Sequence, residues 1–104
     1  DIGQAVIIKN GQILGREDKK GTSTLIRKYG QQGAIIVKTC KPQQDKDLDL
    51  PTIGPDTARL CAQAGMAGIV GQAGQTLLVE RDLVKNIADD HAMFVIGVTL
   101  DAKK

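Results

Sequence analysis

The residues best suited to chemistry lie in one polar stretch, 39–54, which reads TCKPQQDKDLDLPTIG. Asp45, Asp47 and Asp49 occupy alternate positions in it. Side chains alternate between the two sides of an extended backbone, so Asp45 and Asp49 would share one side. Mg²⁺ is commonly held by one or two carboxylates together with substrate phosphate. The spacing therefore fits a magnesium site or a solvated acidic loop, and composition alone leaves both open.

The length of this stretch favours a functional role. Loops longer than about 12 residues are uncommon inside a compact domain and are usually functional or disordered. Prolines and convergent charge distinguish this one from a flexible Gly/Ser linker, so we interpret it as the site. A calcium loop fits poorly, because Leu50 stands at the sixth position, where such a loop needs glycine.

Asp56 lies just beyond the stretch, after Gly54-Pro55. Proline is favoured at the first position of a helix, so a helix should begin at Pro55. A carboxylate in the first turn is stabilised by the helix dipole, which is the structural interpretation of Asp56. In the functional interpretation, the helix start binds an anion, and Asp56 positions or deprotonates a water that attacks a bound phosphate.

Three lysines, Lys38, Lys41 and Lys46, surround the polar stretch from the strand side. Ammonium groups act as point charges that can hold phosphate. Lysines at the end of a strand are also exposed by default, so both interpretations stay open.

Other candidate motifs are better explained by structure. The run GMAGIVGQAGQ lacks GxGxxG and GK[ST], so its glycines are expected at a helix cap, a strand entry and a turn. Cys40 and Cys61 have no zinc-ligand spacing, and we expect reduced thiols, with Cys61 in the core. His91 is expected to play a structural role at a helix end.

Apolar runs and turn signals predict a layered domain of alternating strands and helices. Asn10-Gly11 between apolar runs is typical of a hairpin with a type I′ turn. The predicted order is ββαβαββαβ, an α/β or α+β fold with a mixed sheet and about three helices. The expected strands are 5–9, 12–16, 34–38, 67–70, 76–80 and 94–98.

The helix predictions name particular caps and faces. The first helix should start at Thr22 as N-cap and end at Gly30 or Gly33 in a left-handed conformation. The inward residues are expected to be Leu25, Ile26 and Tyr29 in the first helix, Thr57, Leu60, Cys61 and Ala64 in the second, and Leu83, Val84, Ile87 and Ala88 in the third.

The bulk composition bounds the function. The 104 residues suit one domain, and a net charge of +2 from 14 basic and 12 acidic residues does not suggest a nucleic-acid binder. Tyr29 and Phe94 are the only aromatics, which leaves few stacking platforms for single strands. No apolar run is long enough to span a membrane. The chain begins at Asp1 in what looks like a strand entry, so we expect a fragment of a longer protein.

Ordered segments along essentially the whole chain resemble one family. The segments are DIGQAV, GT at 21–22, VK at 37–38, KP at 41–42, QD at 44–45, DLPTIGP, AGMAGI and FVIGV. The most specific of them is DLPTIGP, which begins at Asp49. They resemble the C-terminal domain of the UDP-2,3-diacylglucosamine pyrophosphatases of the LpxI type. Residues 1–104 would then be one domain of a two-domain enzyme, without its N-terminal domain.

The resemblance implies a hydrolase of lipid A biosynthesis in Gram-negative bacteria. That family cleaves the pyrophosphate of UDP-2,3-diacylglucosamine with water and Mg²⁺, and it releases UMP and 2,3-diacylglucosamine 1-phosphate. The substrate is held between the two domains. It implies a cytoplasmic protein in peripheral contact with the inner membrane, and it leaves room for a homodimer. The isolated chain should show little or no turnover.

By position, the family pattern assigns catalysis to Asp56 and Asp49 and metal binding to Asp45 and Asp49. It assigns substrate binding to Asp1, Gln4, Thr22, Lys38, Lys41, Gln44 and Thr52. The chain departs from the pattern at Lys20 and Ser23, where acids are usual, at Asp47, where a base is usual, and at Leu48, where an aromatic is common. A divergent member that only binds a nucleotide, a phospholipid or a protein partner is therefore the alternative.

Overall fold

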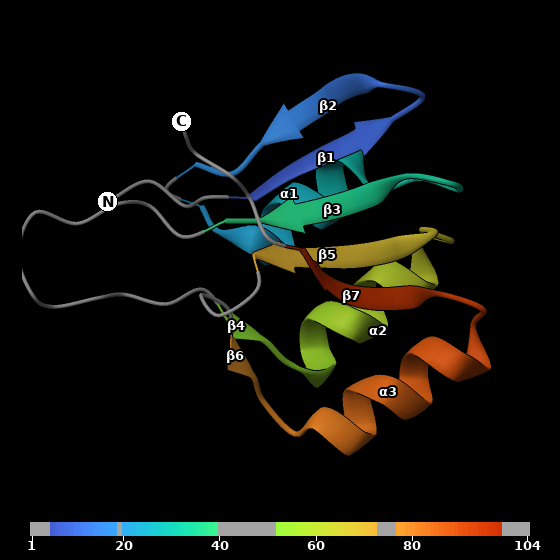
Figure 1. Cartoon of the computed structure of the whole chain (residues 1–104). Helices are drawn as coiled ribbons and strands as arrows, with labels where there is room; N and C mark the ends of the chain where they lie inside the picture. Colours follow the sequence, from blue (N-terminus) through green and yellow to red (C-terminus); the bar gives the residue numbers. More distant parts are fainter. Residues whose placement is uncertain (1–4, 19, 40–51, 73–76, 99–104) are drawn as a thin grey trace, which may run out of the picture.

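The computed structural model describes residues 5–18, 20–39, 52–72 and 77–98. They form a sheet with helices packed against one of its faces (Figure 1). The strands are β1 (Ala5–Lys9), β2 (Gln12–Arg16), β3 (Ile35–Lys38), β4 (Thr52–Ile53), β5 (Gly68–Gln72), β6 (Leu77–Leu78) and β7 (Phe94–Val98), and the helices are α1 (Thr22–Tyr29), α2 (Pro55–Gln63) and α3 (Arg81–Asp90).

The main sheet has the order β2-β1-β3-β5-β7 and is mixed, as predicted. β1 is antiparallel to both of its neighbours, whereas β3, β5 and β7 run parallel. The described part of the chain adds a short strand to the predicted order, because β4 pairs with β6 in a separate two-stranded sheet. Of the expected strand 76–80, the described residues form the short strand β6 (Leu77–Leu78), which pairs with β4, and a turn at Val79 and Glu80.

The first two strands form the predicted hairpin. Asn10 and Gly11 both have positive φ, 54° and 78°, as a type I′ turn requires. The pairing slips between Ile7 and Ile8, which leaves a bulge in the ladder. The backbone N–H of Glu17 donates to Ala5 O at 2.8 Å, so pairing continues past the end of β2.

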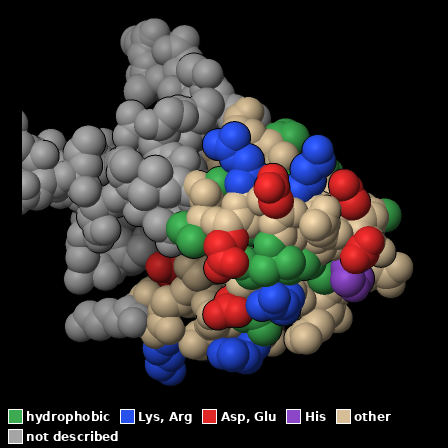
Figure 2. All heavy atoms as spheres, turned by 90° about the horizontal axis from the view of Figure 1, so that it is seen from below, with side chains coloured by type: hydrophobic (Ala, Val, Ile, Leu, Met, Phe, Trp, Pro, Cys, Tyr) green, Lys and Arg blue, Asp and Glu red, His purple; other side chains and the backbone are tan. Residues whose placement is uncertain are grey.

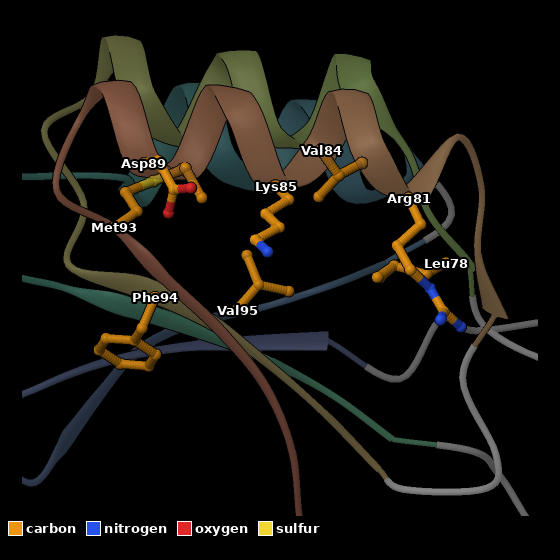
Figure 3. Close-up of a pocket in the computed structure, with 9 residues that line it drawn as sticks. Leu78, Arg81, Val84, Lys85, Asp89, Met93, Phe94 and Val95 are labelled. Atoms are coloured by element: carbon orange, nitrogen blue, oxygen red, sulfur yellow. The ribbon is translucent and has the colours of Figure 1, made fainter.

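The core lies between the sheet and the three helices. Every second residue of the central strands points to this side, so Ile7, Ile36 and Ile69 are fully buried. Figure 3 shows the helices together on one side of the strands. The helices contribute the buried side chains Leu25, Ile26, Ala58, Cys61, Val84 and Ala88.

Several local predictions about the helices are wrong. Gly21, not Thr22, caps α1, because the Thr22 hydroxyl is engaged by Glu17. Gly30, directly after α1, has φ −65° and is not left-handed, whereas Gly33, the other residue predicted for this role, has φ 81°. Leu83 is 37% exposed, because α3 lies at the border of the layer and turns only its Val84–Ala88 side inward.

The buried face of the second helix also differs slightly from the predicted one. Ala58 and Cys61 are its buried residues, with Thr57 only half-buried. Gly65, φ 75°, follows its end as predicted, but Gly71 lies inside β5 rather than in a turn.

Gly15, on β2, packs directly against the ring of Tyr29 on α1. A Cβ at this position would lie 2.3 Å from the Tyr29 ring, which is too close for any real contact. We expect Gly15→Ala to lower the free energy of unfolding by about 1–3 kcal/mol, because the ring must leave its place. Urea unfolding monitored by circular dichroism measures the change.

The control for this prediction is Gly54→Ala, where the nearest atom would lie 3.9 Å away and φ is −123°. It should have little effect on stability. In a Tyr29→Ala background, Gly15→Ala should also cost little. An equal cost with and without the ring would contradict the explanation.

Candidate functional site

The candidate site lies at the edge where β3, β5 and β7 end. β2 runs parallel to β3 across the intervening β1, so it ends at the same edge, and α1 begins there. The start of α2, preceded by β4, lies on the same side of the molecule (Figure 1). Ligands of open α/β sheets bind outside the carboxyl ends of the strands, so this edge is where a site is expected.

A chain of hydrogen bonds joins three elements at this edge. Lys38 Nζ, at the end of β3, donates to Thr22 Oγ1 at 3.3 Å. The Thr22 hydroxyl in turn donates to Glu17 Oε1 at 2.6 Å. The carboxylate therefore fixes the direction of the hydroxyl, which leaves the oxygen lone pairs to accept from the ammonium. The loop after β2, the start of α1 and the end of β3 are held together in this way.

Lys38 is a charged residue with only 7% of its surface exposed. Burial lowers the pKa of its ammonium below 10.5, while the charges of Glu17 and then Cys61 act in the opposite direction. The net lowering means that the folded surroundings disfavour the charged form on balance. A cation kept at such a cost is a candidate for function.

Small residues flank this lysine in the sheet. In the register of the sheet, Lys38 lies between Ala5 on β1 and Gly71 on β5, and Gly71 in turn pairs with Gly97 on β7. These four residues form one row on the helix-facing side, and Lys38 has the only long side chain among them.

Cys61 comes from α2 and lies under the same edge. It is fully buried, as predicted, and it is a free thiol. Burial raises the pKa of its thiol from 9.0 to about 12, although the charge of Lys38 lowers it in part. The thiolate is the nucleophilic form, so Cys61 is unsuited to nucleophilic chemistry at neutral pH.

Asp56 lies in the first turn of α2 as predicted, and its side chain is 95% exposed. It pairs with Arg59 on the next turn at 3.2 Å. Gly54 caps the helix without a side-chain hydrogen bond, so among the described residues no side chain caps the first N–H groups of α2. The start of α2 therefore presents N–H donors and a carboxylate together.

Only some of the predicted site residues fall in the described part of the chain. Thr22 and Lys38 are brought into contact, whereas Asp56 and the backbone of Thr52 lie at the same side without a recorded bond to them. The remaining predictions lie outside the described residues, namely Asp1, Gln4, Lys41, Gln44, Asp45 and Asp49.

Glu17 belongs to no motif in the sequence and is not among the predicted site residues. It is half-buried and holds Thr22. The available signal was its position directly after a strand that ends at the site edge.

A cavity of about 480 Å³ lies beside the site, between α3 and the sheet (Figure 3). Leu78, at one end of it, pairs through β6 with Ile53, just before α2. Arg81 and Lys85 stand among its apolar walls, which include Leu78, Val84, Ala88, Met93 and Val95. On the face seen in Figure 2, lysines and arginines alternate with aspartates and glutamates around hydrophobic side chains.

Comparison with known proteins decides the family. The family model described as LpxI C-terminal domain matches residues 1–96. This chain belongs to the LpxI C-terminal domain family. It is also 38% identical over 109 aligned positions to the UDP-2,3-diacylglucosamine pyrophosphatase LpxI of Caulobacter vibrioides, an alignment that includes 94% of this chain. The chain spans 39% of the length of that relative.

Two features of the described residues bear on the expected setting of a family member. Nowhere in the described ranges do three histidine, cysteine or acidic side chains gather as a metal site would need. The described helices are also too short or too polar to cross a bilayer.

The buried thiol gives a chemical test of this packing. In a Cys40→Ser background, we expect native Cys61 to resist alkylation at about pH 8, because it is buried and its pKa is about 12. Unfolding in urea should expose the thiol and restore an ordinary rate. Mass spectrometry after timed treatment with iodoacetamide measures both rates; equal rates in the two states would contradict the burial.

The cost of burying Lys38 gives a pH-dependent prediction. Lys38→Met keeps much of the volume without the charge, so the variant should be at least as stable as the wild type. Between its lowered pKa and 10.5, the folded wild type binds fewer protons than the unfolded chain. The wild type therefore gains stability as pH rises through that window, and the advantage of Lys38→Met should shrink.

Urea unfolding of both proteins from about pH 8 to about pH 10.5 checks this prediction; Cys61 ionises in the unfolded chain of both proteins, so its contribution largely cancels in the comparison. Lys28→Met, at an exposed position of α1, is the control and should show no such trend. A variant that is less stable than the wild type throughout would show that the charge is stabilising instead.

Proposed function

We propose that this domain forms one half of the active site of a Mg²⁺-assisted UDP-2,3-diacylglucosamine pyrophosphatase. The reaction adds water across the P–O–P bridge and yields UMP and 2,3-diacylglucosamine 1-phosphate. The name of the Caulobacter relative supports the substrate, and the family supports the domain assignment. The observation that carries the proposal is the buried Lys38 ammonium, held by Glu17 and Thr22 in a row that is otherwise free of long side chains.

In this proposal Lys38 contacts a phosphate oxygen of the substrate. Its hydrogen bond to Thr22 holds the ammonium at the edge, so little orientation is lost when the anion binds. A charge in such a dry setting also acts more strongly than one in water, and it favours the extra negative charge of the transition state. Glu17 acts through Thr22 and is a positioning residue.

Asp56 is proposed to orient or deprotonate the attacking water. The N–H groups at the start of α2 would hold phosphate oxygens beside it. The exposure of Asp56 suits a site that is closed by a second body, because the described residues leave this carboxylate open to approach. The remaining part of the two-domain enzyme would supply that body.

The role of Mg²⁺ in this proposal is supported by the sequence alone. Asp45 and Asp49 precede Asp56 and offer hard oxygen ligands, which suit this ion. Bound there, the ion would neutralise phosphate charge during the reaction. The lipid substrate also suggests peripheral contact with the inner membrane from the cytoplasm. The cavity between α3 and β7 would offer apolar walls to an acyl chain.

The alternative is a module that binds a nucleotide or phospholipid without hydrolysing it. The pairing of Asp56 with Arg59 favours this alternative, since it engages the proposed catalytic carboxylate. Turnover and binding assays separate the two: the alternative requires ligand binding with no release of UMP.

A matched pair of variants tests the role of Asp56. The chain is fused to the N-terminal portion of the Caulobacter relative, and release of UMP from UDP-2,3-diacylglucosamine is followed by chromatography. Asp56→Ala should lower kcat by at least about a hundredfold while the fold stays intact. Arg59→Ala removes the same ion pair but keeps the carboxylate, so most activity should remain.

The isolated 104-residue chain should show little turnover in the same assay. Full activity in Asp56→Ala, or equal loss in both variants, would show that Asp56 is not the catalytic carboxylate. Chelation of Mg²⁺ by EDTA should abolish turnover in the fused protein, and added Mg²⁺ should restore it.

A further inference from the structure

The cavity between α3 and β7 has the size and shape of a site for a small elongated molecule. Its volume of about 480 Å³ falls within the roughly 300–1,000 Å³ of pockets that hold small ligands. Figure 3 shows Leu78 and Arg81 at one end of it and Asp89 and Met93 at the other. At about 1.5 Å per residue, the distance along α3 from Arg81 to Asp89 is about 12 Å. The cavity therefore follows the helix for about two turns.

The walls of this cavity are mainly apolar. Val84 and Ala88 of α3 are buried at its inner side, and Val95 of β7 is half-buried opposite them. Phe94 lies at the Met93 end, and 41% of its surface is exposed. Water among such walls finds few polar partners. A ligand that removes this apolar surface from water is therefore favoured.

Two cationic side chains stand over these walls. Arg81 and Lys85 are four residues apart on α3, so they project from the same side of the helix. Figure 3 shows the Lys85 side chain reaching from α3 toward Val95. Neither cation has a hydrogen bond or an ion pair with another residue of the described ranges. Their N–H donors can therefore be used by a ligand in the cavity.

The charges also give the cavity a direction. Asp89 is the one acidic residue among the described residues that line it, and it lies at the end away from Arg81. Glu80 and Asp82 are next to Arg81 in the chain but do not line the cavity. An anionic group is therefore attracted to the Arg81 end and repelled from the Asp89 end.

We propose that this cavity binds a single-chain anionic amphiphile, which is an alkyl chain with a carboxylate or phosphate head. The head lies beside Arg81 and Lys85, and the chain extends past Val84 and Ala88 toward Met93. A guanidinium can donate two parallel hydrogen bonds to either kind of head. Each methylene that the walls cover adds to the affinity.

This proposal does not rest on the proposed pyrophosphatase. An acyl chain of the lipid substrate is uncharged and would use only the apolar walls, whereas the two cations favour an anionic group on the molecule that fills the cavity. The ligand proposed here contacts neither Lys38 nor Asp56. Its absence would therefore leave the proposed function unchanged, and an inactive enzyme would leave this site unchanged.

NMR titration of the ¹⁵N-labelled 104-residue chain with sodium dodecanoate tests the proposal. We expect saturable shifts of the amides of residues 84–89 and 93–95, with a Kd below about 1 mM, as suits a ligand of this size. Dodecyltrimethylammonium has the same chain and the opposite charge. It should bind at least about tenfold more weakly, because Arg81 and Lys85 repel its head.

A double variant, Arg81→Gln with Lys85→Gln, tests the role of the two cations. It should raise the Kd of dodecanoate at least about tenfold and remove the preference for the anionic head. Lys28→Gln is the matched control, because Lys28 is equally exposed but lies on α1; it should bind dodecanoate like the wild type.

Val95→Phe fills part of the cavity and should weaken the binding of both amphiphiles. The amide spectrum without ligand shows whether each variant is folded. Arg81 and Lys85 are exposed, so the double variant keeps its fold and tests the site even where Val95→Phe unfolds.

Dodecyl phosphate, titrated in the same way, distinguishes the two kinds of head, and the tighter ligand identifies which one the site prefers. Three results would overturn the proposal. One is the absence of saturable shifts at concentrations below those at which dodecanoate forms micelles. Another is equal affinity for the anionic and the cationic amphiphile. The third is unchanged binding of dodecanoate by the double variant.

Discussion

The arrangement of the site depends on the burial of one ammonium group. The apolar strand Ile35–Lys38 carries Lys38 to the end of the sheet and under the helices, where hydration is lost. Glu17 and Thr22 offset part of that loss through two hydrogen bonds in series. The same contacts hold the loop after β2 and the start of α1 against the central strand. The hydrogen bonds that stabilise the charge of Lys38 therefore also stabilise the local fold.

This burial has a consequence for Cys61. The thiol shares the interior with Lys38, and the pKa values of the two groups move in opposite directions because both charged forms are disfavoured by burial. A Lys⁺–thiolate pair would therefore have to overcome desolvation twice. The observed packing favours a neutral thiol.

Much of the fold follows from local sequence rules, and the errors have a common physical origin. Asn10-Gly11, Pro55 and Gly65 sit where their backbone preferences predict, since turns and caps depend on a few neighbouring residues. Leu83 and Thr22 behave differently from their predictions because tertiary contacts decide them. A helix at the border of a layer exposes a leucine, and a carboxylate five residues away captures the expected capping hydroxyl.

The candidate site is only partly predictable from the sequence, because some of its residues belong to a motif and others are brought to the site by the fold. Lys38 and Thr22 were selected through the family resemblance, and the structure joins them. Glu17 has no motif of its own, and its role appears only when β2 and β3 end at the same edge. Likewise, Gly71 lies in a glycine-rich run for which a turn is predicted, whereas the structure places it inside β5, paired with Lys38.

The geometry of the sheet separates the proposed phosphate site from the face opposite the helices. The substrate is proposed to meet the ends of the strands, where Lys38 and the start of α2 lie, whereas that face lies at right angles to the strand ends. Lys38 points to the helix side of β3 and Val37 to the opposite side, so adjacent residues of one strand have different surroundings. A substitution at Val37 can therefore change the packing of that face without removing any group from the proposed phosphate site.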